Sequence, residues 1–412
     1  MESTQQQEAS INGVERNLRA LWGEWGLQTG SKDGPPLPNL SNAVAILEND
    51  PELKDRCHYD EFLQRVLVTG DAREWSDKDD LSLVIHIQRE VGIPRISREH
   101  VAQAVVMVAS KNTRHCVRDW LGGLQHDGVA RIDQFFSDCF SAEDNEYTRA
   151  VSRNFWLSLV ARAFEPGCKV DNMVVLEGAQ GIGKSQALKA IAGDWFAEMH
   201  ESATNPKGFA EILQGKLLIE ISEMDAFNKV EVNRVKQTIS CPSDRYRPSY
   251  GHRAQDHKRQ CIFVGTTNRD DWHRDETGAR RFWPIACSGD VRLDIIRENR
   301  DQLFAEAVTR HKAGEPHWLM PVAATKAEQA ARYQSDPWQE RISEIIKGEA
   351  TTTAAHVAEK LGIDIQKRDR ATEMRVAAAL RHLGWRRARK MVAGEKRSYQ
   401  YVRGEVGEAG EA

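Results

Sequence analysis

The chain has 412 residues, a net charge of −4 and 40 % hydrophobic residues, the composition of a globular protein large enough for two or three domains. No apolar run approaches ~18 residues, so a transmembrane helix is not expected. The polar start, Met1 to Ser10, has no signal-peptide core, and the seven scattered cysteines include no CxxC pair. These features argue against a disulfide or zinc framework and predict a cytoplasmic protein with reduced thiols.

The elements predicted in chain order begin with a leader and a helical region. Glycines and prolines between Gly30 and Pro38 indicate a flexible leader over residues 1–40. Apolar residues at three- and four-residue spacing then predict a helical collar or adaptor domain over 41–164. Short apolar strands alternate with helical stretches over 165–320, which predicts an α/β domain with a mostly parallel sheet.

The last part of the chain is helical and basic. Between Lys367 and Arg397 there are 11 Lys and Arg residues against three acidic ones, a local charge of +8. A helix-turn-helix pattern followed by a hairpin pattern predicts a winged-helix-like module over 335–403, with a disordered tail over 404–412. The charge favours duplex or origin DNA as a partner. The alternatives are a solvated helical face or a pair of protein-interaction helices.

A phosphate-binding motif opens the α/β domain. Residues 178–185 read Gly-Ala-Gln-Gly-Ile-Gly-Lys-Ser, a complete GxxxxGK[ST] sequence between an apolar strand at 173–176 and a helical run at 186–191. Glycines let backbone N–H groups approach phosphates, and the helix N-terminus adds partial positive charge. Lys184 is expected to contact the β- and γ-phosphates of ATP, and Ser185 to bind Mg²⁺. The predicted nucleotide-binding residues are Gly178, Gln180, Gly181, Gly183, Lys184, Ser185 and Gln186.

An acidic strand end follows this motif. Residues 217–221 form an apolar strand that carries Glu220, and Glu223 lies just beyond it. A carboxylate at such a place holds a Mg²⁺-bound water and polarises the attacking water. Glu223 is the first choice for both roles because it lies just past the strand, Glu220 is the second, and Asp225 caps the next turn. The alternative for each acid is an ordinary surface charge.

Two further motifs come later in the α/β domain. Asn268 follows a third strand at 261–265, and its amide is expected to orient water against the γ-phosphate, unless it only turns the chain. Arg280 and Arg281 follow a glycine turn, which is typical of an arginine finger that completes the nucleotide site of a neighbouring subunit. The alternative is a pair of surface arginines packed over Trp283. An arginine finger of this kind requires an oligomer.

This ordered series of motifs resembles the virulence-associated protein E family of phage and genomic-island proteins, which is similar to superfamily 3 helicases. The resemblance runs from about Leu121 to Trp318. Its most similar segments are residues 166–171, 177–185, 215–225, 264–268 and 274–284. The resemblance implies an AAA+-like ATPase core, a hexamer and translocation along single-stranded DNA. Relatives often carry an upstream primase domain, but the residues ahead of this motor contain no obvious paired-acid polymerase site.

Superfamily 3 motors move DNA with a hairpin between the acidic strand and the sensor strand. The matching interval here is 244–259, where basic residues alternate with aromatic ones. This combination suits contacts with the phosphates and bases of single-stranded DNA. The residues expected to contact DNA are Arg245, Arg247, Tyr250, Arg253, Lys258 and Arg259. The alternative is a structural hairpin whose arginines pair with Asp244 and Asp256.

These motifs together predict an ATP- and Mg²⁺-dependent DNA helicase or translocase of phage or mobile-element replication. It would act on single-stranded DNA as a homo-oligomeric ring, a hexamer by the family resemblance, in the cytoplasm of a bacterial host. Two alternatives stay open from the residues alone. One is a regulatory P-loop ATPase, a loader or an interference factor, that does not unwind DNA. The other is a duplex DNA-binding protein whose assembly is controlled by nucleotide.

Overall fold

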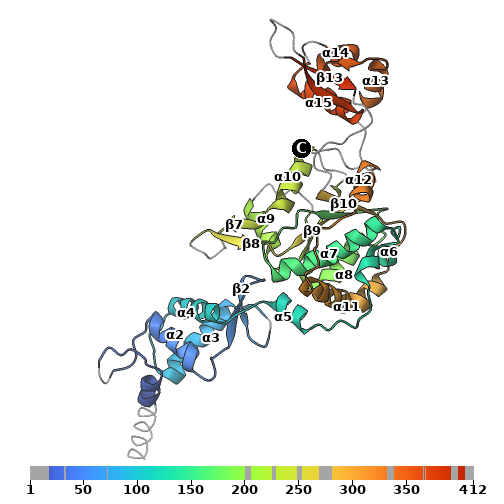
Figure 1. Ribbon diagram of the computed structural model, residues 1–412. Helices are drawn as coiled ribbons and strands as arrows, with labels where there is room; N and C mark the ends of the chain where they lie inside the picture. Colours follow the sequence, from blue (N-terminus) through green and yellow to red (C-terminus); the bar gives the residue numbers. More distant parts are fainter. Residues whose placement is uncertain are drawn as a thin grey trace, which may run out of the picture. The chain divides into compact units, whose positions relative to one another are not determined.

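The protein is described by a computed structural model (Figure 1). The described residues are 18–31, 34–71, 73–199, 206–224, 229–247, 253–268, 281–331, 338–364, 366, 368–390 and 398–403. They divide into two compact units, of which the larger ends at Ala331 and the smaller follows it. Among the described helices, none is both long and apolar enough to cross a lipid bilayer. All seven cysteines are free thiols.

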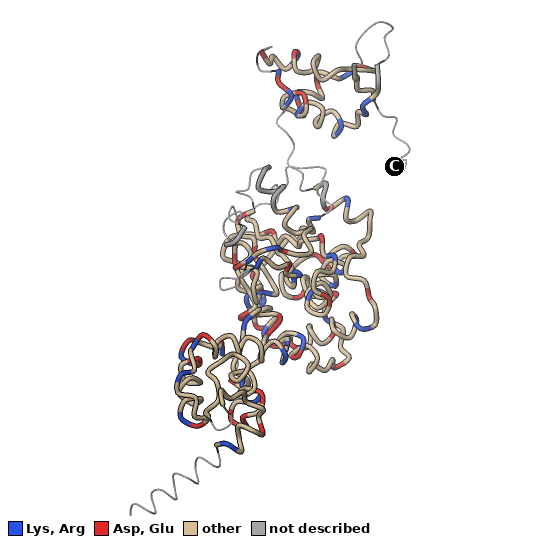
Figure 2. The backbone as a smooth tube through the Cα atoms, turned by 90° about the vertical axis from the view of Figure 1, so that its left-hand side faces the viewer, with Lys and Arg blue, Asp and Glu red and all other residues tan. Residues whose placement is uncertain are grey.

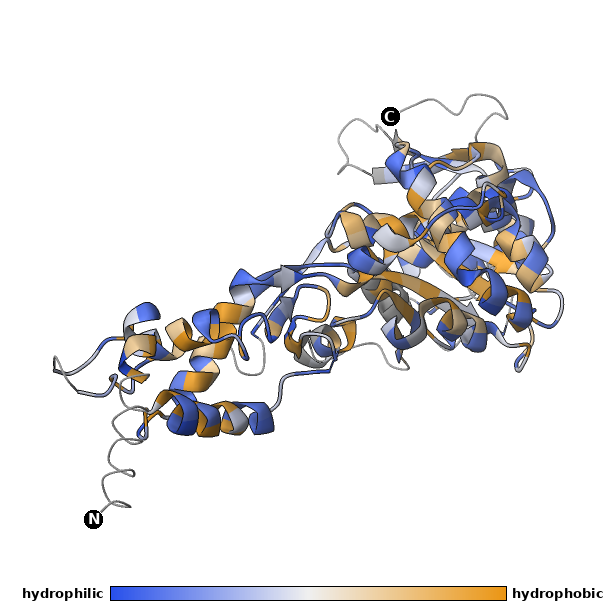
Figure 3. Ribbon diagram, turned by 90° about the horizontal axis from the view of Figure 1, so that it is seen from below, coloured by the Kyte–Doolittle hydropathy of each residue, from blue (hydrophilic) through white to orange (hydrophobic). Residues whose placement is uncertain are grey.

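The larger unit begins with a layer of helices beside a small sheet. Its elements are α2 (Leu40–Asn49), β1 (Cys57–Asp60), β2 (Arg65–Val68), α3 (Asp77–His86), a π-helical turn (Ile87–Val91), α4 (Arg98–Lys111) and β3 (Thr113–Arg114). The strands pair in the order β2-β1-β3. Figure 3 shows helices that are hydrophobic on one side and hydrophilic on the other, as expected when one face is buried.

The flexible leader predicted for residues 1–40 is wrong for its described second half. Trp25 and Leu27 are 9 % and 8 % exposed and pack into the same cluster as α2 and α4. The Trp22 indole also donates a 2.7 Å hydrogen bond to the Val91 carbonyl. The glycines and prolines there indicate turns, but the tryptophans that precede them are anchored, Trp25 by burial and Trp22 by its hydrogen bond. Residues 1–17 lie outside the described part of the chain.

The centre of the larger unit is a five-stranded parallel sheet. Its strands are β4 (Met173–Glu177), β5 (Phe196–Met199), β6 (Leu218–Ile221), β9 (Ile262–Thr267) and β10 (Phe282–Ala286). They pair in the order β10-β4-β9-β6-β5, every neighbouring pair being parallel. The predicted α/β domain with a mostly parallel sheet is therefore confirmed. Because all five strands run the same way, their carboxyl ends meet at one edge.

Helices cover this sheet. They are α5 (Cys116–Gly123), α6 (Phe135–Phe140), α7 (Glu146–Phe164), α8 (Lys184–Ala192), α9 (Pro206–Leu213), α10 (Lys229–Ser240), α11 (Leu293–Lys312) and α12 (Val322–Ala331), with short 3₁₀ turns at Ile132–Gln134 and Gly193–Trp195. Most of α7 is buried, and it contacts α11 and β9. A helix buried on nearly all sides belongs to a core.

The boundary predicted between a helical domain ending at 164 and an α/β domain starting at 165 is thus misplaced. Residues of α5, α6 and α7 share one hydrophobic cluster with β4, β6 and β9. The N-terminal part also contains the three-stranded sheet and is not purely helical. Helical periodicity identifies a helix but not the element against which it packs, which explains the error.

A separate antiparallel hairpin is inserted between β6 and β9. It consists of β7 (Ser243–Tyr246) and β8 (Gln255–Lys258), with Arg245 opposite Asp256. Its position in the chain is the interval in which a DNA-contacting hairpin was predicted. Residues 248–252 at its tip lie outside the described residues.

The smaller unit has its own core. Its elements are α13 (Trp338–Ile345), β11 (Thr351–Thr352), α14 (Ala354–Lys360), α15 (Arg370–His382), β12 (Trp385–Lys390) and β13 (Ser398–Arg403). The strands pair in the order β11-β13-β12. Ile342, Val357, Leu380 and Trp385 are buried together between the helices and this sheet. Lys and Arg positions, blue in Figure 2, recur along this unit.

Candidate nucleotide-binding site

The phosphate-binding motif lies where β4 ends and α8 begins. Gly183 precedes the first residue of α8 and has a φ of 100°, a conformation that side chains disfavour. Gly178 follows β4, and a Cβ atom there would lie 2.7 Å from the Cys287 carbonyl oxygen and 2.9 Å from Ile182 Cδ1. Each of these two glycines is therefore required by the shape of the loop, which confirms the strand–loop–helix context that the motif needs.

Lys184 is held inside this loop. Its Nζ donates to the carbonyl oxygens of Gly178 at 2.6 Å and Ala179 at 2.9 Å, and to Asn268 Oδ1 at 3.4 Å. The residue is only 8 % exposed. The loop thus fixes the ammonium group at the start of α8, where the helix N-terminus also favours an anion. Asn268, which directly follows β9, lies beside it, and its role as a γ-phosphate sensor stays a prediction.

Glu220 is the acid that connects the strands to the motif. It is completely buried, and its Oε1 accepts 2.7 Å hydrogen bonds from Ser185 Oγ and from Thr266 Oγ1. A buried carboxylate needs hydrogen-bond donors, and these two hydroxyl groups supply them to Oε1. Glu223 was ranked first for the metal, but the carboxylate bonded to the predicted Mg²⁺ ligand Ser185 is that of Glu220. Thr266 was not singled out from the sequence.

Glu223 occupies a different place in the same pocket. Its backbone φ is 55°, which is uncommon for a residue other than glycine and is a strain found at functional sites. Its side chain is exposed and faces a pocket of about 270 Å³. The pocket is lined by Gln180, Gly181, Gly183, Lys184, Ser185, Gln186, Glu198, Ser222, Glu223, Thr266, Thr267 and Asn268. The two candidate acids therefore have distinct positions, one buried against Ser185 and one facing the cavity.

The pocket gathers most of the predicted nucleotide residues, and some that the sequence did not indicate. Gly178 is the one predicted loop residue outside its lining. The unexpected members are Glu198, Ser222, Thr266 and Thr267. Glu198 lies on β5, beside Glu220 in register. Since β5 was not recognised as a strand, nothing in the sequence placed Glu198 near the motif.

Of the two arginines predicted to form a finger, Arg280 lies outside the described residues and Arg281 immediately precedes β10. Phe282 is in register with Met173, so Arg281 lies at the amino end of the sheet. The phosphate motif lies at the carboxyl end, five residues further along β4, roughly 16 Å at about 3.3 Å per residue. Arg281 cannot reach the phosphate site of its own chain.

The surroundings of Arg281 are open. Its Nε donates a 3.0 Å hydrogen bond to Ser240 Oγ at the end of α10. It also lines a cavity of about 640 Å³ together with Trp283, Trp318 and Lys326. Trp318 is 60 % exposed. The arginine is therefore near the surface and beside Trp283, an arrangement compatible with either predicted role.

The structure contradicts one of the DNA contacts predicted for the hairpin. Arg259 was predicted to contact DNA, but it is only 3 % exposed, and its guanidinium binds both carboxylate oxygens of Asp244 at 2.9 and 2.5 Å. It also donates to the Thr238 carbonyl. A side chain enclosed in this way has no surface to offer to DNA. The alternative of a structural arginine is correct for this residue.

The other hairpin residues fall into two groups. Arg245 is exposed and pairs with Asp256 at 3.0 Å, as the structural alternative expected. Arg247, Arg253 and Lys258 are exposed, and their contact with DNA stays a prediction. Tyr250 lies outside the described residues.

Comparison with known protein families assigns the chain. The family model described as the virulence-associated protein E-like domain matches residues 121–336, more than half of the chain. The chain belongs to the virulence-associated protein E-like family. The resemblance based on the motifs is confirmed, and the matched region begins within α5, in agreement with the core found around the sheet.

Solved structures with a similar fold are also known. The apo structure of the C-terminal region of NrS-1 (its residues 305–718) has a TM-score of 0.50 at 14 % identity and covers 84 % of this chain and 96 % of that one. An A-form apo structure of the same region has a TM-score of 0.50 at 12 % identity, with coverage of 89 % and 100 %. At such identity the likeness shows the fold alone. None of the curated proteins compared with the chain matches it.

Proposed function

We propose that this virulence-associated protein E-like chain is an ATP-dependent DNA helicase or translocase of phage or mobile-element replication, working in the cytoplasm of a bacterial host. The observation that carries the proposal is the hydrogen bond between Glu220 and Ser185, next to the contact between Lys184 and Asn268. Three strands deliver a lysine, a hydroxyl, an acid and an amide to one pocket at the carboxyl edge of a parallel sheet. This is the set that nucleoside triphosphate hydrolysis needs.

Each residue of the pocket has a separate role in the proposed ATP hydrolysis. Lys184 and the loop N–H groups bind the β- and γ-phosphates, and Asn268 orients the attacking water. Glu223, which faces the cavity, polarises that water as it attacks the γ-phosphorus and as ADP leaves. Ser185 and Glu220 are hard oxygen ligands that fit Mg²⁺, directly or through its waters. When bound, Mg²⁺ neutralises charge on the phosphates.

The position of Arg281 supports an oligomeric enzyme. It lies at the sheet edge opposite its own phosphate motif, so an arginine finger formed by this residue would act on the nucleotide of another copy. A head-to-tail contact of that kind closes into a ring when repeated. We therefore propose a homo-oligomeric ring, a hexamer as the family resemblance implies, with Arg281 and Arg280 as candidates for the finger.

Two basic regions are the proposed DNA contacts. The exposed hairpin residues Arg247, Arg253 and Lys258 suit the phosphates of single-stranded DNA. In the smaller unit, the succession α13-β11-α14-α15-β12-β13 supports a winged-helix-like module that binds duplex or origin DNA. Arg387 lies 3.6 Å from the centre of the Tyr399 ring, which keeps a cation on the β12–β13 hairpin.

The decisive experiment measures ATP hydrolysis and strand separation together. The purified chain is tested with and without single-stranded DNA, and on a forked duplex, beside Lys184→Ala. We expect DNA-stimulated hydrolysis and unwinding in the wild type, with both lost in the variant because the phosphates lose their cation. Unchanged turnover in Lys184→Ala would refute the site. Hydrolysis without unwinding on any fork polarity would favour a regulatory ATPase, a loader or an interference factor.

A further inference from the structure

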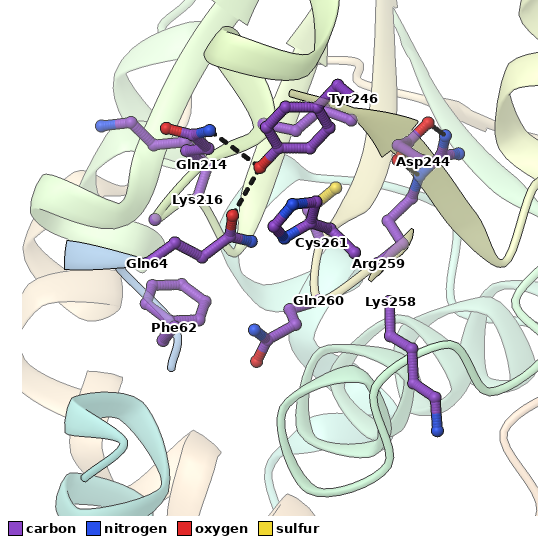
Figure 4. Close-up of a pocket in the computed structure, with 13 residues that line it drawn as sticks. Phe62, Gln64, Gln214, Lys216, Asp244, Tyr246, Lys258, Arg259, Gln260 and Cys261 are labelled. Carbon is purple, nitrogen blue, oxygen red and sulfur yellow. Dashed lines mark hydrogen bonds and ion pairs between the residues drawn. The ribbon is translucent and has the colours of Figure 1, made fainter. Parts of the chain in front are cut away.

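The turn between β1 and β2 reaches from the N-terminal part into the core around the sheet (Figure 4). Phe62, in that turn, is 1 % exposed and belongs to the hydrophobic cluster of the sheet. Its ring packs edge-on against Trp195, with centroids 6.1 Å apart. Leu63 lies so close to Gly215 that a Cβ atom at residue 215 would be 2.7 Å from Leu63 Cδ2. The turn is therefore wedged against the core and not merely adjacent to it.

The same turn holds the base of the hairpin. The Tyr246 hydroxyl, on β7, donates to Gln64 Oε1 and accepts a 2.7 Å hydrogen bond from Gln214 Nε2. The His257 ring, on β8, stacks on Tyr246 with centroids 4.1 Å apart. Figure 4 shows Tyr246 between the two glutamines, with both hydrogen bonds drawn. We call Gln64, Gln214, Tyr246 and His257 the hairpin clamp.

A second pair of hydrogen bonds supports the clamp. His115, just before α5, forms a 2.6 Å hydrogen bond with Gln260 Oε1, and Gln260 Nε2 donates to the Glu61 carbonyl at 3.1 Å. Gln260 lies in the three-residue segment between the hairpin and β9. Both strands of the hairpin base are therefore tied to the turn that begins at Asp60.

The clamp is also connected to the proposed nucleotide pocket. Gln214 lies a few residues before β6, which carries Glu220. β8 continues through Gln260 into β9, whose last two residues, Thr266 and Thr267, line the pocket. The clamp thus lies at the amino ends of β6 and β9, whose other ends form the pocket. Each strand is a stiff connection of roughly 13–20 Å. These two strands therefore connect the base of the hairpin directly to the pocket.

We infer that Gln64 is a positioning residue that sets the hairpin relative to β6 and β9, and so makes ATP hydrolysis responsive to DNA. This inference rests on the proposed function and adds a role for the N-terminal part. Gln64 has a φ of 56°, so its turn is locally strained and its side chain is aimed by the backbone. The polar bonds of the clamp are few and short. Loss of one of these hydrogen bonds should make the hairpin more mobile while the pocket residues keep their positions.

The first arm of the test measures the hairpin itself, without DNA or nucleotide. Amide hydrogen exchange of residues 243–246 and 255–258 is compared among wild type, Gln64→Ala and the control Gln103→Ala, an exposed glutamine on α4. We expect roughly tenfold faster exchange in Gln64→Ala only, the size of one lost hydrogen bond. Unchanged exchange would overturn the inference whether or not the protein hydrolyses ATP.

The second arm measures coupling in the full-length protein. Basal and DNA-stimulated ATPase are measured for Gln64→Ala, Tyr246→Phe and the double variant, with Gln64→Glu as the rescue, since it keeps an acceptor for the Tyr246 hydroxyl. We expect basal turnover within about twofold of wild type, stimulation reduced roughly tenfold in both single variants, and little further loss in the double. Full stimulation in Gln64→Ala, or additive losses, would overturn the inference. A wild type without ATPase activity would instead refute the proposed function.

Discussion

The two edges of the central sheet are built in different ways. At the carboxyl edge, most pocket residues come from continuous motifs attached to the ends of buried strands, and Glu198 on the partly buried β5 is the exception. At the amino edge, the contacts of the hairpin clamp join segments that are far apart in sequence, such as Gln64 and Tyr246, 182 residues apart. Strand ends in a parallel sheet are brought together by the fold alone. The amino edge depends on specific side-chain contacts, which a sequence pattern does not encode.

The prediction with the largest expected effect tests whether Arg281, at the amino edge of one subunit, acts on the nucleotide pocket at the carboxyl edge of another. Arg281→Ala should lower ATP turnover about 10³–10⁵-fold while ATP binding is preserved, because the arginine acts on the transition state of a neighbour's nucleotide. Turnover and binding of a fluorescent ATP analogue are measured side by side. Arg281→Lys is the matched control and should not restore activity, since it lacks the planar fork.

Mixing two inactive variants tests directly whether Arg281 acts on a neighbouring subunit. Arg281→Ala subunits have an intact phosphate motif, and Lys184→Ala subunits have an intact Arg281. A mixture of the two inactive proteins should regain part of the activity, because some interfaces then combine both intact groups. A mixture that stays inactive while forming the same oligomers would contradict a finger provided by another subunit.

The second prediction separates the two acids of the carboxyl edge. Glu223→Gln should lower turnover by about 10²–10⁴-fold with unchanged ATP and Mg²⁺ affinity, because only the polarisation of water is lost. Glu220→Gln should also raise the Mg²⁺ concentration needed for nucleotide binding, because its oxygen is bonded to Ser185. Magnesium titrations of ATP binding distinguish the variants. Identical titration curves for both would show that the carboxylates share one role.

The sequence predicted the carboxyl edge well for a physical reason. Three of its strands are apolar runs, and β4, β6 and β9 are buried at every position. The other two were not recognised. β5 is only partly buried, and β10 contains Pro284, which is tolerated because β10 is an edge strand.

The errors have a common origin. Three predictions failed because distant segments bury the residues concerned. Trp25 was assigned to a flexible leader, α7 to a different domain from the sheet, and Arg259 to a DNA contact. Local composition reports the type of side chain but not its partner. The choice between Glu220 and Glu223 was undetermined for the same reason, since it depends on the hydrogen bond to Ser185.

The third prediction concerns stability at the base of the hairpin. Arg259→Ala should lower the free energy of unfolding by about 3–5 kcal/mol, because it leaves Asp244 without its buried partner. Arg245→Ala breaks only the exposed pair with Asp256 and should cost less than about 1 kcal/mol. Urea unfolding followed by tryptophan fluorescence gives both values. A stable Arg259→Ala protein with a specific loss of DNA binding would restore the original interpretation of this residue.

The smallest expected effect is a pH dependence of the amino edge. Burial lowers the pKa of His257 and of His115 below the ordinary value of 6.5, so the folded protein keeps both rings neutral. The unfolded chain binds these protons more readily below pH 6.5. The stability that comes from the neutral rings is therefore complete above that pH and is lost as the pH falls, by at most about 1.4 kcal/mol per pH unit for each ring.

The contribution of His257 to the pH dependence of stability can be isolated by comparison with a variant that lacks this histidine. The free energy of unfolding is measured at pH 7.5 and 5.5 for wild type and His257→Gln, which cannot titrate in this range. His58 and His317, whose pKa values burial also lowers, contribute equally to both proteins and cancel. We expect a smaller loss in the variant than in wild type. Equal losses would mean that the His257 ring is as readily protonated in the folded protein as in the unfolded chain, and that the clamp does not exclude water from it.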